Sequence, residues 1–61
     1  MTDLEAAKEI ASTMATGITD TGAGFIAGFS DETTAKAYMS AISTLNVAAV
    51  RTGNSVTVTN P

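Results

Sequence analysis

The chain has 61 residues, a net charge of −3, and no cysteine, histidine or tryptophan. This length allows a single small domain, and the missing residue types exclude a disulfide and a zinc site of the usual kind. Because a domain of this size buries only about 60% of the surface that its unfolded chain exposes, it must gain stability from tight internal packing or from burial against another chain.

Six acidic residues outnumber the three cations, Lys8, Lys36 and Arg51. Nucleic acids and anionic membranes are bound largely through clusters of cationic side chains, so we expect neither as a partner. No apolar run approaches the roughly 20 residues that span a bilayer, and the acidic start of the chain lacks the basic and apolar regions of a secretory signal. We therefore expect a cytoplasmic protein, or a component of a virion if its source is viral.

Residues 3–17 are predicted to form an amphipathic helix. Apolar residues recur along this range, and one position beyond it, at spacings of three and four: Leu4, Ala7, Ala11, Met14 and Ile18. Thr2 followed by Glu5 fits a capping box, in which each side chain bonds the other residue's backbone. Gly17 would end the helix, since glycine readily adopts the backbone conformation that follows a last turn.

Residues 19–30 are the most ambiguous part of the chain. Three glycines within seven residues would each weaken a helix by about 1 kcal/mol relative to alanine. Phe25 and Phe29 nevertheless stand four residues apart, as neighbours on one helical turn do. We predict a glycine-rich loop with a short helical turn.

Residues 31–45 are predicted to form a second amphipathic helix, capped by Ser30 or Asp31 and ended by Asn46. Asp31 and Glu32 also place negative charge in the first turn, which suits the helix dipole. The apolar stripe of this helix consists of Ala35, Tyr38, Met39, Ile42 and Leu45.

Residues 47–59 change to the alternating pattern of a β-hairpin. A three-residue turn at 52–54 would pair Val50 with Val56, and we favour this register. A two-residue turn at 52–53 is the alternative. It would place four apolar residues on one face: Val47, Ala49, Val56 and Val58. The pattern alone does not choose between the two registers.

Together these elements predict one α+β domain over residues 1–61. It would consist of two amphipathic helices joined by a glycine-rich connection and followed by a C-terminal β-hairpin. No internal repeat and no linker is apparent in the sequence.

Asp20, Thr21 and Gly22 form the Asp-Thr-Gly triplet of aspartic peptidases, whose mechanism needs two facing carboxylates. In those enzymes the Asp follows an apolar strand, whereas here we expect it to follow a helix, so a polar turn is favoured. The segment at 22–24 lacks the strand and the Lys-Ser/Thr pair of a phosphate-binding loop, and a calcium loop starting at Asp20 would have glycines at two ligand positions. We predict that the chain is not an enzyme and has no catalytic, cofactor-binding or metal-binding residue, no cofactor and no small-molecule substrate.

A helix pair followed by a hairpin also fits a small winged-helix DNA-binding domain. Residues 31–45 would then be the recognition helix and residues 47–59 the wing. Lys36 would be the only cation on that helix and Arg51 the only one on the wing. This is the least favoured interpretation, because phosphate contacts depend on cations.

The bulkiest apolar cluster, Phe25, Ile26 and Phe29, lies in the least regular segment. These side chains either fill the core or form a patch that buries against a partner, and the sequence leaves both interpretations open. The hairpin also offers strand edges that a second chain could extend. The candidate interface residues are Phe25, Ile26, Phe29, Val56 and Val58.

These observations favour a small non-catalytic structural or assembly protein that acts by self-association. Abundant Ala, Thr and Gly in a short acidic chain are common among phage proteins, which favours a virion or accessory component. The alternative is a monomeric acidic binding module, or an inhibitor of a basic nucleic-acid-handling host protein. An enzyme would need an active site shared between subunits, with Asp20 as its only candidate residue.

Overall fold

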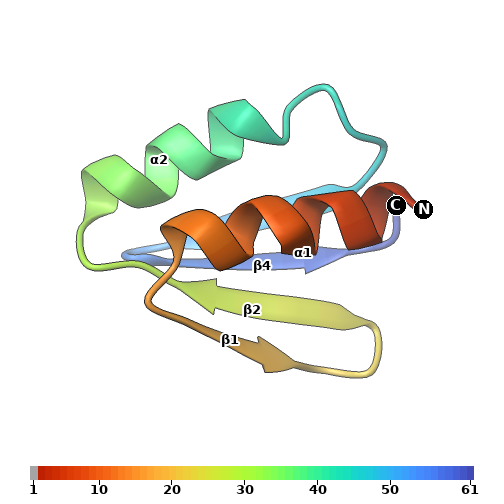
Figure 1. The fold of residues 1–61 in the computed structure, drawn as a ribbon, viewed down its shortest axis with the longest axis horizontal. Helices are drawn as coiled ribbons and strands as arrows, with labels where there is room; N and C mark the ends of the chain where they lie inside the picture. The colour runs from red at the N-terminus through yellow and green to blue at the C-terminus, as the bar shows by residue number, and fades with distance from the viewer. Residues whose placement is uncertain (1) are drawn as a thin grey trace.

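The computed structural model describes residues 2–61, which form two helices and one four-stranded antiparallel sheet (Figure 1). In chain order the elements are α1 (Asp3–Met14), β1 (Gly17–Asp20), β2 (Gly24–Gly28), α2 (Glu32–Ala41), β3 (Ala48–Thr52) and β4 (Ser55–Thr59). The strand order is β1-β2-β4-β3, so β2 and β4 are central and β1 and β3 are the edges. Both helices lie on the same face of the sheet, which gives a two-layer α+β arrangement. Within residues 2–61, neither helix has the length and hydrophobicity that a membrane span needs.

The predicted order of helix, connection, helix and hairpin is wrong between residues 19 and 30. This segment contains the end of β1 and all of β2, which pair as an antiparallel hairpin. The spacing of Phe25 and Phe29 suggests a helical turn, but Ala27 between them is buried as well. The buried positions therefore repeat every two residues, which is the period of a strand and not of a helix.

Both hairpins turn on a glycine with a positive φ. Gly22 (φ +85°) and Gly53 (φ +60°) are each the first residue of a two-residue loop. The second loop residues, Ala23 and Asn54, do not have positive φ. This is the arrangement of type II′ turns, whose twist matches that of the flanking strands. Gly22 therefore marks a turn and not a weak helix.

The first predicted helix is present as α1, but it is shorter than expected. It begins with the predicted capping box, because the Glu5 amide donates to Thr2 Oγ1 at 3.1 Å and the Thr2 amide donates to Glu5 Oε1 at 3.2 Å. α1 ends at Met14. Gly17 does not stop the helix, since it is already the first residue of β1.

The second predicted helix is present as α2 and is also shorter than the range 31–45. Asp31 caps it, and the Thr34 amide donates to the Asp31 carboxylate at 2.7 Å. This backbone hydrogen bond lowers the pKa of Asp31 below its ordinary value. α2 ends at Ala41, and its apolar stripe continues into the turns that lead to β3.

The C-terminal hairpin is present, but its favoured register is wrong. Val50 pairs with Thr57 and not with Val56, because the loop consists of Gly53 and Asn54. Ala49, Val56 and Val58 then lie together on the inner face of the sheet. The alternative turn predicts the same grouping of these residues. The hairpin is also not a separate unit, since its second strand pairs along its whole length with β2.

The fold consists of two copies of one αββ unit, α1–β1–β2 and α2–β3–β4. In the strands, each residue of the first unit corresponds to the residue 31 positions later, so the sheet pair Ile18–Ala27 corresponds to Ala49–Val58. The helix of the second unit begins two residues earlier than this offset would place it. All pairs between β1 and β2 map in this way onto pairs between β3 and β4. The residues that are identical in the two units are Thr2/Thr33, Ala6/Ala37, Ser12/Ser43, Thr13/Thr44, Thr21/Thr52 and Gly22/Gly53. The expectation that the chain has no internal repeat is therefore wrong.

A pseudo-two-fold axis relates the two units and passes through the centre of the sheet. The central pair of β2 and β4, Ile26 with Thr57, maps onto itself. Most buried positions of the two units also correspond: Ala7 with Tyr38, Ala11 with Ile42, Phe25 with Val56, and Ala27 with Val58. The exceptions are Phe29 and Ala35, whose counterparts Asn60 and Leu4 are exposed and half-buried. Because the corresponding residues differ in size, the repeat appears in register and burial more clearly than in residue identity.

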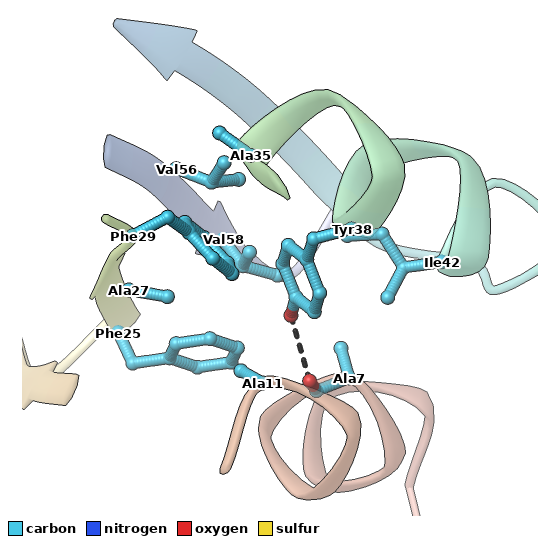
Figure 2. Close-up of a cluster of buried hydrophobic side chains, with 10 residues drawn as sticks. All are labelled: Ala7, Ala11, Phe25, Ala27, Phe29, Ala35, Tyr38, Ile42, Val56 and Val58. Atoms are coloured by element: carbon cyan, nitrogen blue, oxygen red, sulfur yellow. Dashed lines mark hydrogen bonds between the residues drawn. The ribbon is translucent and has the colours of Figure 1, made fainter. Parts of the chain in front are cut away.

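Tyr38 is the largest fully buried side chain and joins the two helices (Figure 2). Its hydroxyl donates to the Ala7 carbonyl oxygen at 2.7 Å, and its ring centroid lies 5.1 Å from that of Phe29. The small side chain at Ala7 leaves room for the larger Tyr38 at the corresponding position of the second unit. Burial raises the pKa of Tyr38 to about 12.

Because Tyr38 is the only tyrosine, the near-ultraviolet absorbance of phenolate follows this one group. We expect the folded chain to form phenolate near pH 12, whereas the unfolded chain does so near pH 10, about the ordinary value. The unfolded chain therefore binds fewer protons between these values, so stability is complete below about pH 10 and falls by up to about 2 kcal/mol between about pH 10 and 12. Tyr38→Phe has no hydroxyl to ionise, so it is the control and should show no such loss of stability over this pH range. A folded wild-type chain that titrates at the ordinary value would contradict the burial of the hydroxyl.

Candidate functional site

The face of the sheet opposite the helices is not covered by any element within residues 2–61 (Figure 1). We call it the open face. Strand alternation and the sheet register assign the following positions to it: Gly17, Thr19, Gly24, Ile26, Gly28, Ala48, Val50, Thr52, Ser55, Thr57 and Thr59. None of these residues is charged, and most are glycine, serine or threonine. A sheet face of this kind is smooth and neutral.

Ile26 and Val50 are the large hydrophobic side chains that stay exposed among the described residues, at 37% and 63% of their surface. Both lie on the open face, in one row across the sheet, with Thr57 between them. Neighbouring strands are about 4.8 Å apart, so the two side chains stand about 10 Å apart. Within residues 2–61, the exposed large hydrophobic side chains thus lie in the middle row of the uncovered face.

The charged side chains lie on the helices, in the turns, and on the helix-covered side of the two edge strands. Lys8 Nζ of α1 contacts Asp20 Oδ1 of β1 at 2.7 Å. Glu32 of α2 contacts Lys36 at 3.1 Å and Arg51 of β3 at 3.7 Å. The hydrogen bond and charge of Lys36, followed by the charge of Arg51, lower the pKa of Glu32. Each of the three cations therefore has an acidic partner.

The predicted interface residues fall into two groups. Phe25, Val56 and Val58 are at most 1% exposed and Phe29 is 6% exposed, so these four belong to the core under the helices (Figure 2). Ile26 lies on the open face. The structure thus places in the core most of the cluster that the sequence leaves open between core and interface. The period of two within β2 is the signal that separates Ile26 from its neighbours.

Val50 is the open-face residue that sequence reasoning missed. The favoured register pairs it with Val56 and so directs it into the core. The two-residue loop at Gly53 and Asn54 moves Val50 to the opposite face. A Gly-Asn pair between two alternating segments is a recognised hairpin signal and would have placed Val50 correctly.

Asp20 ends β1, so the premise that it follows a helix is wrong. Its carboxylate is exposed and bonded to Lys8, and Thr21 and Gly22 lead into the turn. No three acidic side chains within residues 2–61 lie close enough together to hold a metal ion. An open hollow of about 370 Å³ on α1 is lined by Glu5, Lys8, Glu9 and Ser12, all from that single helix.

The winged-helix interpretation loses its structural basis. The hairpin does not project as a wing, because β4 is a central strand of the sheet. The two cations assigned to DNA contacts, Lys36 and Arg51, both contact Glu32.

Comparisons with models of known families, with curated proteins and with solved structures find no match for this chain.

Proposed function

We propose that this chain is a small non-catalytic structural or assembly subunit that acts by self-association. The observation that carries the proposal is the open face, which is uncharged and holds the exposed Ile26 and Val50. Burial of apolar surface is favourable by about 25 cal/mol per Å², and burial of this face desolvates no charged side chain. When a second copy covers the open face of this two-layer chain, both sheets become buried between the helices of the two copies.

The concentration dependence of the mass in solution tests this proposal. We expect the weight-average mass, measured by sedimentation or light scattering, to rise above the 6.1 kDa of the single chain as the concentration increases from about 10 μM to about 1 mM, the range of weak interfaces. Salt should change this association little, because the buried surface is neutral. A mass that stays at that of the single chain throughout the range contradicts self-association.

The role of a virion or accessory component is the finer part of the proposal. It is supported by the composition, with 11 alanines and 11 threonines in 61 residues, and by no observation on the open face. Mass spectrometry of purified particles from the source would test it directly, since a structural component is present at a fixed number of copies per particle.

A monomeric acidic binding module is the second candidate, and the hollow on α1 favours it. Glu5 and Glu9 line this hollow together with Lys8, whose charge is paired with Asp20. This alternative predicts a monomer at every concentration and binding to a basic peptide that weakens as salt is added. Binding that is unchanged by Glu5→Gln and Glu9→Gln together would exclude this surface.

A further inference from the structure

We propose that a second copy of this chain covers the open face, sheet against sheet, so that the glycine-bearing half of one face receives the threonine-bearing half of the other. This inference rests on the proposed self-association and adds the surface and the register. Three observations carry it: the unequal halves of the open face, two glycines that the fold does not require, and the distribution of charge.

The two αββ units contribute unequal halves to the open face. In the row across the sheet that contains Gly17 and Gly28 of the first unit, the second unit has Ser55 and Thr52. At this end of the β1–β2 pair neither strand has a side chain, because Gly17 and Gly28 are paired with each other. The second half has a side chain at every position. One half is hollow where the other is raised.

The fold itself does not require glycine at either position. A Cβ at Gly17 would meet no heavy atom within 4 Å, and a Cβ at Gly28 would meet only the Gly17 carbonyl oxygen at 3.9 Å, an ordinary contact. Neither residue has a positive φ. Glycine weakens a strand, and where no turn or bulge requires it, it often marks the close approach of another backbone or a ligand.

The charge distribution indicates that the partner is a second copy. Two chains of net charge −3 repel each other wherever their acidic surfaces meet. The open face holds none of the charged residues, so two copies can meet there without bringing like charges together. A strongly basic or acidic partner would find no complementary charge on this face. A neutral face with one hollow and one raised half is complementary to itself.

A two-fold axis that runs along the strands, between β2 and β4, produces the match. This axis places β2 over β4 of the second copy and β1 over its β3, as in an aligned sheet sandwich. The register then sets Gly28 over Ser55 of the second copy and Gly17 over its Thr52. In the central row, Ile26 lies over Thr57 of the second copy, and Val50 lies over its Thr19. Both exposed apolar side chains become buried in the same arrangement.

The size of the open face sets the strength of the pair. Four strands of about five residues cover about 19 by 16 Å, so two copies bury at least about 600 Å² in outline. Stable interfaces bury about 1,200–2,000 Å². The pair is therefore a weak dimer that forms at high micromolar concentration. In a larger assembly, several such contacts act together and strengthen the association.

Three variants of the full chain test the surface and its register by concentration-dependent mass, with circular dichroism to confirm folding. Ile26→Lys places a charge at the centre of the open face, and we expect it to weaken the dimer at least about tenfold. Gly28→Val fills the hollow with a residue that favours strands, so we expect a monomer that is folded at least as well but that dimerises about tenfold more weakly. Ala37→Lys adds the same charge on the exposed side of α2 and should leave the dimer unchanged.

The outcomes distinguish the face-to-face pair from self-association in general. Weakening by both face variants with retention in Ala37→Lys supports the face-to-face pair. Self-association that survives Ile26→Lys and Gly28→Val overturns the pair but leaves the proposed function standing, with an edge strand or a helix as the contact. A wild-type chain that is monomeric at every concentration overturns both and leaves the open face to a different partner.

Discussion

Phe25→Ala is expected to lower the free energy of unfolding by about 3–5 kcal/mol, the usual result of truncating a buried phenylalanine. Phe25 is 1% exposed and is among the largest side chains of a core that is otherwise rich in alanine and valine. A domain of this length has about 3–9 kcal/mol of stability in total. The variant should therefore unfold near or below room temperature, as followed by circular dichroism in urea.

Ile26→Ala is the matched control for this prediction, since the two residues are adjacent in β2 and point to opposite faces. Measured at a concentration low enough to keep the chain monomeric, it should cost less than about 1 kcal/mol, as surface substitutions usually do. Equal losses in the two variants would contradict the assignment of Phe25 to the core and of Ile26 to the open face.

Gly24→Ala is expected to destabilise the chain by about 1–3 kcal/mol, the cost of forcing extra atoms into a packed site. A Cβ at Gly24 would overlap the Val58 carbonyl oxygen and lie 2.9 Å from the Thr59 Cα, both of which are backbone atoms of β4. The pairing of Gly24 with Thr59, at one end of the β2–β4 pair, would have to shift to admit it. Urea denaturation of the variant measures this cost.

Gly17→Ala is expected to raise the stability of the chain, although Gly17, like Gly24, is the first residue of a strand. The added methyl group meets nothing within 4 Å, and alanine restricts the unfolded chain more than glycine does. This variant should therefore gain about 0.4–1 kcal/mol. If both substitutions changed stability in the same direction, the close approach of Gly24 to β4 would not be the reason for that glycine.

The parts of the fold that could be predicted are those with local signals. Thr2 and Glu5 mark the start of the first helix and Asp31 that of the second, because a cap depends only on residues three positions apart. The second hairpin follows from strict alternation in residues 55–59. These elements need no knowledge of the rest of the chain.

The first hairpin could not be recognised from its glycines alone. Gly22 serves a turn and Gly24 a close contact with a strand more than thirty residues later, whereas an isolated segment shows only low helix propensity. That long-range contact, with β4, is also what makes 25–29 a central strand. The internal repeat was hidden for a related reason, since Ala7 and Tyr38 occupy equivalent positions with very different volumes.

The candidate site was predicted in part. Composition and small size point to association, which stays a prediction, and Ile26 is the one candidate interface residue that lies on the open face. The other four chosen residues lie in the core, because bulk and hydrophobicity do not tell which face of a strand a side chain occupies. Val50 was missed because the face of every residue in β3 depends on the length of one turn.

The measurement that most directly tests the face-to-face pair is an isotope-filtered nuclear Overhauser experiment. It uses a mixture of labelled and unlabelled chains at about 1 mM, where weak interfaces are populated. This experiment records only contacts between different copies. The face-to-face pair predicts contacts from the Ile26 methyl groups to Thr57 of the other copy and from Val50 to its Thr19. Contacts between copies that involve only the helices or the edges of β1 and β3, or no such contacts at all, would contradict it.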